Sequence, residues 1–274
     1  MTFTPTDISD RLALMQHLSE AARAITLPLF ETDLAITNKG DNVLFDPVTE
    51  ADIEGERVLR QIIRDAFPKD SIEGEELPDY QGENDFSWTL DPIDGTRGFI
   101  AGVPVWSTLI ALSYQGQPVL GLIDVAAQDK CYWGDLSGET KRAWRVHAGE
   151  TTTLNTRKVD TLKAAILGCT EPLAMFKPGE RAAYEIIRRG VRFSRLGLDA
   201  YGYGLLCEGR MDIVIEGLLK PCDVRALMPV IEGAGGKITG WHGQNPVDGG
   251  RIVCVGNEAL LPELYTYLQR AMDS

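Results

Sequence analysis

Hydrophobic patterning changes near residue 150, and this change constrains the fold more than any other feature of the sequence. Before it, apolar runs at 108–112 and 119–123 flank a short Gln-Gly-Gln segment, which is typical of antiparallel strands joined by a tight turn. After it, short apolar runs alternate with segments of helical length, which is typical of an α/β unit. We therefore predict helices on a largely antiparallel sheet over residues 1–150 and an α/β sub-domain over residues 151–274.

Spacing and boundary signals predict the individual elements. Apolar residues recur at helical spacing over 8–25, and a second helix is predicted to be capped by Asp52 and stopped by Pro68. The segment Trp88-Thr89-Leu90 is a strand-like approach to Asp91. For the second half we predict strands at 164–167, 191–196, 211–215 and 252–255, and helices at 179–189, 199–208, 224–234 and from an Asn257 cap through Leu268.

Charge and composition exclude several classes of function. The 274 residues have a net charge of −13, and such a surface repels nucleic acid and anionic membranes. No apolar run approaches the roughly 18–20 residues that a membrane helix needs. Five scattered cysteines without a CxxC pair argue against a disulfide framework and a thiolate metal site, and they fit a reducing cytoplasm. The three histidines lie outside any recognisable motif, so zinc chemistry and histidine acid–base catalysis are not expected.

The segment Asp91-Pro92-Ile93-Asp94-Gly95-Thr96 is the densest chemical signal in the chain. Pro92 fixes the backbone of a tight turn, and Gly95 lets the chain approach a ligand closely. The main-chain amides of Gly95 and Thr96 are then placed to face an anion. Upstream, Glu75 and its acidic neighbours add further carboxylates beside a glycine. The alternative interpretation is that all of these are solvated loop charges.

Carboxylates that converge in a fold need compensation. Two of them about 4 Å apart repel by roughly 4 kcal/mol at an effective dielectric near 20. A fold that gathers several therefore requires a cation or raised pKa values. Because the ligands are all oxygen atoms, magnesium, manganese or calcium is favoured over zinc or copper.

Three blocks of sequence resemble the inositol monophosphatase-like phosphatases. They are Asp46-Pro47-Val48-Thr49-Glu50-Ala51-Asp52, Gly74-Glu75-Glu76 followed by the 91–96 segment, and Cys222-Asp223 running to Gly233-Ala234-Gly235-Gly236. Their order and spacing match the family, and the resemblance covers most of the chain. It implies a layered αβαβα sandwich of the inositol monophosphatase/fructose-1,6-bisphosphatase type, a Mg²⁺-dependent phosphate monoester hydrolase and a homodimer.

The resemblance also implies roles for individual residues. Thr96 and Asp52 orient the attacking water and, with Glu75, are the implied catalytic residues. Asp46 is similar to an outer acidic residue near the most weakly held metal. The family usually has Trp-Asp at the last metal ligand, where this chain has Cys222-Asp223. The implied ligands of two or three Mg²⁺ ions, with Mn²⁺ as a possible substitute, are Glu75, Asp91, the carbonyl of Ile93, Asp94 and Asp223. The implied substrate-binding residues are Gly95, Thr96, Asp199, Glu216 and Asp223.

Within the family, residues 195–203 and 214–224 look most like the histidinol-phosphate phosphatase branch. Glu216 matches a glutamate that contacts the substrate alcohol, and Asp199 lies where inositol phosphatases carry a small residue. Two carboxylates beside the leaving group favour a substrate with an ammonium group, which L-histidinol phosphate has and inositol lacks. The alternative for Asp199 is that it caps the following helix.

Other functions remain open at this point. An inositol-1-monophosphatase or a broad-specificity sugar or polyol phosphatase is the first alternative, and a 3′-phosphoadenosine bisphosphate nucleotidase is the second. A non-catalytic metal-binding protein is a third, which the retention of Thr96 and Asp52 disfavours. Arg97 is predicted to be a surface or subunit contact, and Trp106, Tyr201 and Tyr203 are predicted to lie in the core or an interface.

Overall fold

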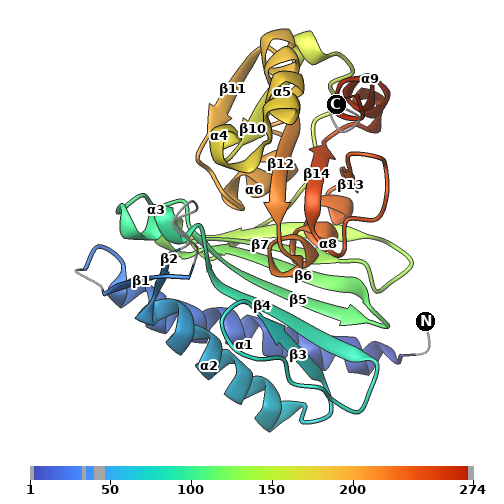
Figure 1. The fold of residues 1–274 in the computed structure, drawn as a ribbon. Helices are drawn as coiled ribbons and strands as arrows, with labels where there is room; N and C mark the ends of the chain where they lie inside the picture. Colours follow the sequence, from blue (N-terminus) through green and yellow to red (C-terminus); the bar gives the residue numbers. More distant parts are fainter. Residues whose placement is uncertain (1–2, 33–34, 40–46, 271–274) are drawn as a thin grey trace.

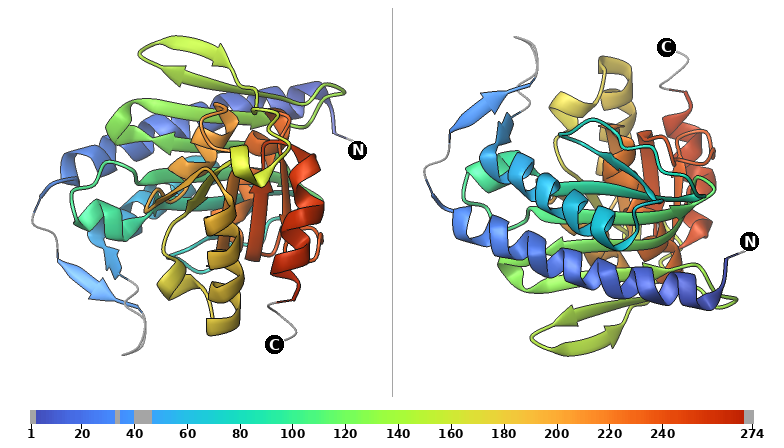
Figure 2. Two further views of the ribbon diagram at one scale, coloured as in Figure 1. Left: turned by 90° about the horizontal axis from the view of Figure 1, so that it is seen from above. Right: turned by 90° about the horizontal axis from the view of Figure 1, so that it is seen from below.

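A computed structural model describes residues 3–32, 35–39 and 47–270, and it has five alternating layers of helices and sheets (Figure 1). Helices α1 (Pro5–Leu29) and α2 (Glu50–Ala66) lie side by side across one face of a seven-stranded sheet (Figure 2). Helices α6 (Tyr201–Cys207) and α8 (Leu227–Gly233) lie between this sheet and a five-stranded sheet. Helices α5 (Pro178–Gly190) and α9 (Leu261–Leu268) form the outer layer. The predicted αβαβα sandwich is confirmed.

The seven-stranded sheet is antiparallel except at one edge. Its strand order is β3-β4-β5-β6-β7-β8-β9, and only β3 and β4 run parallel. The predicted turn between β5 and β6 is confirmed, and both of its residues, Gln115 and Gly116, have positive φ, as a type I′ hairpin turn requires. The strands are β3 (Ser71–Gly74), β4 (Phe86–Asp94), β5 (Ser107–Tyr114), β6 (Gln117–Val125), β7 (Lys130–Asp135), β8 (Arg142–His147) and β9 (Glu150–Thr153).

The N-cap of α2 is not the predicted residue, Asp52, and this difference matters for the site. The N-cap is Thr49, whose side chain accepts a hydrogen bond from the amide of Ala51, and Asp52 is the third helical residue. The Asp52 carboxylate accepts from the Thr49 amide at 2.8 Å and from the Thr49 hydroxyl at 2.6 Å, which completes a capping box. The prediction that Asp52 is the cap itself was wrong, because a β-region Thr49 precedes it. A short antiparallel pair, β1 (Ile36–Asn38) with β2 (Pro47–Thr49), leads into this helix.

The five-stranded sheet has the order β11-β10-β12-β14-β13. Strand β10 is parallel to both of its neighbours, whereas β14 is antiparallel to β12 and β13. The alternation of strands and helices predicted for this half is confirmed. The strands are β10 (Ile166–Cys169), β11 (Phe193–Leu196), β12 (Ile213–Leu219), β13 (Lys237–Gly240) and β14 (Gly250–Val255).

The helix predicted over 224–234 is divided into α7 (Pro221–Arg225) and α8. Pro229 explains the break, because proline has no amide hydrogen for the carbonyl of Arg225 and its ring crowds that carbonyl. Helix α8 packs closely on the seven-stranded sheet where glycine lies beneath it: a Cβ on Gly134 would come within 2.1 Å of the Pro229 carbonyl carbon. This close packing sets the position of α7 against the ends of β4 and β5.

Two smaller differences concern the ends of helices. Asn257 caps a short 3₁₀ turn (Glu258–Leu260), and α9 follows directly from it. Helix α6 begins two residues later than the predicted start at Asp199. A four-residue helix, α4 (Pro172–Met175), precedes α5.

Candidate functional site

The end of strand β4 presents two carboxylates that a regular strand would separate. Asp91 and Asp94 are three residues apart, and residues at odd spacing in a strand point to opposite faces. In the register with β5, however, Asp91 pairs with Leu109 and Asp94 with Ser107, so three steps on β4 oppose two on β5. This bulge inserts one extra residue and re-aims the side chains that follow it. The two carboxylates thereby reach the same site.

Asp223 joins these carboxylates from the other half of the chain. It lies in the first turn of α7, where its carboxylate accepts from the amide of Lys220 at 2.7 Å. One oxygen from each of Asp91, Asp94 and Asp223 lies within 4.8 Å of the others. Glu75, which directly follows β3, forms a second such group with Cys222 and Asp223. Both groups have ligand atoms close enough to hold a metal ion.

Burial raises the pKa of most of these carboxyl groups. Asp91 is 2% exposed, and burial followed by the charges of Glu75, Asp94 and Asp223 raises its pKa well above the usual value. The pKa of Asp94 is also raised well above its usual value, first by burial and then by Asp199 and Asp223. Burial raises the pKa of Asp223 to about 6. Buried carboxylates that repel one another are stabilised by a divalent cation, so these residues fit an oxygen-ligated metal.

Glu75 has a different environment, because two lysines contact it. The Nζ atom of Lys220 lies 2.8 Å from Glu75 Oε1, and that of Lys39 lies 3.3 Å away. Burial acts to raise the pKa of Glu75, but the two ammonium groups outweigh it and lower the pKa. Neither lysine was predicted as part of the metal site, and the sequence around them has no signal that distinguishes them from surface lysines.

Thr96 and Asp52 meet beside the β4 turn. The Thr96 hydroxyl lies 3.2 Å from Asp52 Oδ1 and 3.1 Å from the carbonyl oxygen of Ile93, so it can donate to either. Burial raises the pKa of Asp52 despite its bonds to Thr49 and Thr96. The structure thus brings together Thr96, Asp52 and the carbonyl of Ile93.

Gly95 allows a close contact with Asp199. Its φ is +81°, and a Cβ at this position would lie 2.9 Å from Asp199 Cγ. Asp199 itself has a φ of +47° and does not cap α6, because the N-cap is Ala200 and no side chain caps the helix. The Ala200 amide instead donates to Asp94 at 2.8 Å. The helix-cap alternative for Asp199 is therefore wrong.

A small cavity of about 40 Å³ adjoins the metal carboxylates. Glu216 lines it and accepts hydrogen bonds from the Tyr203 hydroxyl at 2.8 Å, the Thr170 hydroxyl at 2.5 Å and the Thr170 amide at 2.9 Å. Burial outweighs these bonds and raises the pKa of Glu216 to about 7. Burial likewise raises the pKa of Asp199 to about 6, although the Arg97 charge opposes it. The wall of the cavity includes Asp94, Asp199, Ala200, Tyr203, Glu216 and Asp223.

The remaining sequence predictions have mixed outcomes. Trp106, Tyr201 and Tyr203 are buried, as predicted, but the hydrogen bond of Tyr203 to Glu216 was not. Arg97 is exposed and its charge acts on Asp199, so it lies beside the site. Asp46 lies outside the described residues. Among those residues, no helix is long and apolar enough to cross a membrane.

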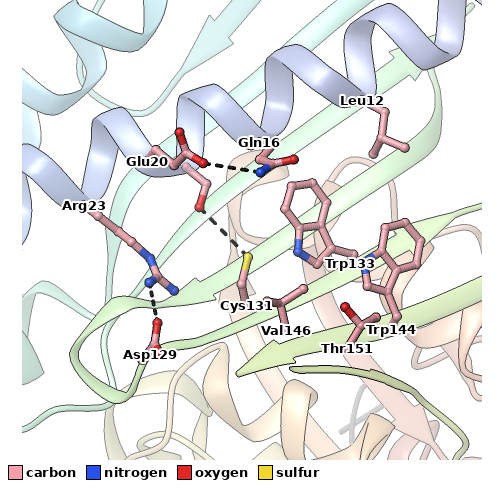
Figure 3. A pocket seen from close by; sticks show the side chains of 11 residues that line it. Leu12, Gln16, Glu20, Arg23, Asp129, Cys131, Trp133, Trp144, Val146 and Thr151 are labelled. Atoms are coloured by element: carbon pink, nitrogen blue, oxygen red, sulfur yellow. Dashed lines mark hydrogen bonds and ion pairs between the residues drawn. The ribbon is translucent and has the colours of Figure 1, made fainter. Parts of the chain in front are cut away.

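A larger hollow of about 480 Å³ lies elsewhere, between α1 and strands β7 to β9 (Figure 3). The indole rings of Trp133 and Trp144 stack on its floor with an interplanar angle of 2°. Cys131 also lines it, but burial raises the pKa of this thiol well above its usual value, so it is not a reactive thiolate. None of the metal-site carboxylates borders this hollow.

Comparison with known proteins agrees with this geometry. The model of the inositol monophosphatase family matches residues 9–273. The chain belongs to the inositol monophosphatase family. It is 39% identical over 248 residues to the "Bifunctional phosphatase IMPL2, chloroplastic" of Arabidopsis thaliana, which covers 88% of this chain and 68% of the plant protein. It is 32% identical to a histidinol-phosphatase of Chlorobaculum parvum, covering 90% and 92% of the two chains.

A solved structure of an inositol monophosphatase from Zymomonas mobilis superposes with a TM-score of 0.81 at 34% identity, covering 97% of this chain and all of the other. The inositol-1-monophosphatase of Rhizobium meliloti is 29% identical. This member of the inositol monophosphatase family is a phosphatase that hydrolyses phosphoric monoesters.

Proposed function

We propose that this phosphatase hydrolyses L-histidinol phosphate to L-histidinol and phosphate with Mg²⁺ as its cofactor, as a step of histidine biosynthesis. The observation that carries the proposal is the pair of carboxylates in the cavity beside the metal carboxylates, the buried Glu216 and the partly buried Asp199. Three histidinol-phosphatases at 32–33% identity support it, compared with 27–29% for three inositol-1-monophosphatases among the curated relatives. The predicted homodimer and cytoplasmic location stay predictions.

An ammonium group in the cavity would suit Asp199 and Glu216 electrostatically. With pKa values of about 6 and 7, both carboxyl groups hold protons more readily than usual because burial penalises their charge. A cation bound between them lowers both pKa values and forms charge-assisted hydrogen bonds. A neutral polyol offers no such compensation. The cavity therefore favours the amine-bearing phosphate monoester over an inositol phosphate.

The carboxylates of the metal site are proposed to act on the phosphate group of the substrate through bound Mg²⁺. Glu75, Asp91, Asp94, Asp223 and the carbonyl of Ile93 are the groups that would hold Mg²⁺. An ion bound there would supply charge neutralisation for the phosphate dianion, a lowered pKa of bound water and stabilisation of the leaving alkoxide. Two or three ions, with Mn²⁺ as a substitute, remain the predicted occupancy.

The chain itself positions the water and the phosphate. Asp52 accepts a hydrogen bond from the Thr96 hydroxyl, which leaves the lone pairs of the Thr96 oxygen to accept a hydrogen bond from the attacking water. Asp52 is held for this role by its two bonds to Thr49 at the helix start. The amides of Gly95 and Thr96 are proposed to donate to phosphate oxygens, and Asp199, the proposed amine-binding carboxylate, approaches Gly95 closely.

A substrate panel tests the proposal. The purified protein with Mg²⁺ is assayed on L-histidinol phosphate, myo-inositol 1-phosphate, fructose 1,6-bisphosphate and 3′-phosphoadenosine 5′-phosphate. We expect the highest kcat/KM for histidinol phosphate. A higher value for myo-inositol 1-phosphate would instead support the second candidate, an inositol monophosphatase, which the 34% identity to the Zymomonas mobilis enzyme favours.

A further inference from the structure

Helix α2 turns a line of buried charged side chains toward the site. Asp52, Glu56 and Arg60 are spaced four residues apart, so they lie on one face of the helix. They are 2%, 0% and 8% exposed. Asp52 already has a role beside Thr96, but the proposed chemistry does not use Glu56 or Arg60. Because a buried charge is costly unless it is paired, the partners of these two residues indicate what they do.

Glu56 and Arg60 bind the main chain that directly follows Glu75. Glu56 Oε2 accepts from the amide of Glu76 at 2.7 Å, and its Oε1 accepts from the amide of Leu77 at 3.2 Å. Arg60 donates through Nη2 to the carbonyl of Leu77 and through Nη1 to that of Pro78, both at 2.9 Å. Arg60 Nε also donates to Glu56 Oε1 at 2.6 Å, which joins the two side chains into one unit.

The same glutamate contacts the residue that precedes Glu75. A Cβ on Gly74 would lie 2.0 Å from Glu56 Oε1, so only glycine leaves room for the carboxylate there. Strand β3 ends at this glycine, and its ladder with β4 ends with it. Beyond that point, the bonds from Glu56 and Arg60 hold the main chain where the sheet no longer does.

We propose that Glu56 and Arg60 are positioning residues that fix the main chain directly after Glu75 and thereby set the affinity of the metal site. This inference rests on the proposed role of Glu75 as a metal ligand. Because the same helix carries Asp52 in its first turn, one rigid element places both the water-orienting pair and a metal ligand. The two parts of the site therefore keep a fixed relation to each other.

The test compares Glu56→Gln with a matched control on the same helix. Gln has the size of Glu, but its NH₂ group would face amide donors that now bind a carboxylate oxygen. Glu54→Gln removes the same charge from an exposed ion pair. The side chains of its two members, Glu54 and Arg57, are 44% and 62% exposed. Mg²⁺ and Mn²⁺ binding to the full chain is measured by calorimetry. We expect Glu56→Gln to weaken binding about 10–100-fold, the usual cost of losing such a supporting residue, and Glu54→Gln to leave it unchanged.

A double-mutant cycle separates positioning from general damage to the fold. If Glu56 acts through Glu75, Glu56→Gln should cause no further loss of metal affinity in a Glu75→Gln background. Arg60→Lys, which keeps the charge but loses the forked bonds, should weaken binding in the same direction and serves if Glu56→Gln does not fold. The inference is overturned if these variants bind metal as tightly as the unmodified chain does. It is also overturned if Glu56→Gln costs as much metal affinity in the Glu75→Gln background as in the unmodified chain.

The outcomes for this inference and for the proposed function are distinct. If the unmodified chain does not hydrolyse histidinol phosphate, the substrate proposal is overturned. The effect of Glu56→Gln on metal affinity is measured independently of that result. An unchanged metal affinity in Glu56→Gln would overturn the positioning role even if histidinol phosphate proves to be the substrate.

Discussion

Replacing Tyr203 with Phe should shift the pH dependence of the enzyme in a predictable direction. Tyr203 is 1% exposed, and its hydroxyl donates to Glu216 Oε2 at 2.8 Å, which favours the ionised carboxylate. A hydrogen bond to a charged group contributes about 1.5–3 kcal/mol. Since one pH unit corresponds to about 1.4 kcal/mol, the variant should raise the pKa of Glu216 by about one to two units.

The assay is the pH profile of kcat/KM for L-histidinol phosphate, which reports ionisations of the free enzyme. Removing the donor favours the protonated Glu216, so the acidic limb of the profile should move up by about one to two pH units. Activity near pH 7 should fall and should recover at higher pH. Tyr201→Phe is the matched control, because Tyr201 lies on the same helix but its hydroxyl accepts from Lys130. Superimposable profiles for Tyr203→Phe and the unmodified enzyme would refute the role of Glu216 in binding the amine.

Three further predictions concern the carboxylates and the metal. Glu75→Gln and Asp94→Asn should each abolish Mg²⁺-dependent phosphate release while circular dichroism shows an intact fold; undiminished turnover in both would refute the metal assignment. Asp199→Asn should raise KM for histidinol phosphate about tenfold and barely change it for myo-inositol 1-phosphate, and equal effects on both substrates would count against amine recognition. Chelated protein should lose stability as pH rises from about 4 to 7. The folded pKa of Asp223 is about 6 against an ordinary 3.8, and the pKa values of Asp91 and Asp94 are also raised. The folded state therefore holds protons in this range that the unfolded state has released. Saturating Mg²⁺ should reverse this loss in a thermal melt, and a melting temperature independent of both pH and Mg²⁺ would contradict it.

Much of the fold could be predicted because its signals are local. The β5–β6 hairpin and the strand–helix alternation of the second half follow from hydrophobic period and turn residues. The division between α7 and α8 was missed, although Pro229 marks it, because the apolar pattern continues through the proline. The Thr49 cap of α2 was missed because threonine and aspartate are both common capping residues, so residue type does not decide between Thr49 and Asp52.

The candidate site was predictable only in part. Asp91 and Asp94 stand out as a pair, but their convergence depends on a bulge that shows only in the register with β5. Asp223 comes from the other half of the chain, and the resemblance to a family, not its spacing, associated it with them. Tyr203 and Thr170 reach Glu216 through tertiary packing between α6, β10 and β12, and no local pattern indicates such contacts.

The central claim is that carboxylates from both halves of the chain hold the same divalent ions. Anomalous diffraction from crystals grown with Mn²⁺ tests it most directly, because the ions are then located without reference to activity. We predict anomalous peaks at coordination distance from Glu75, Asp91, Asp94 and Asp223. Peaks at other sites, or none at Mn²⁺ concentrations that saturate activity, would contradict it.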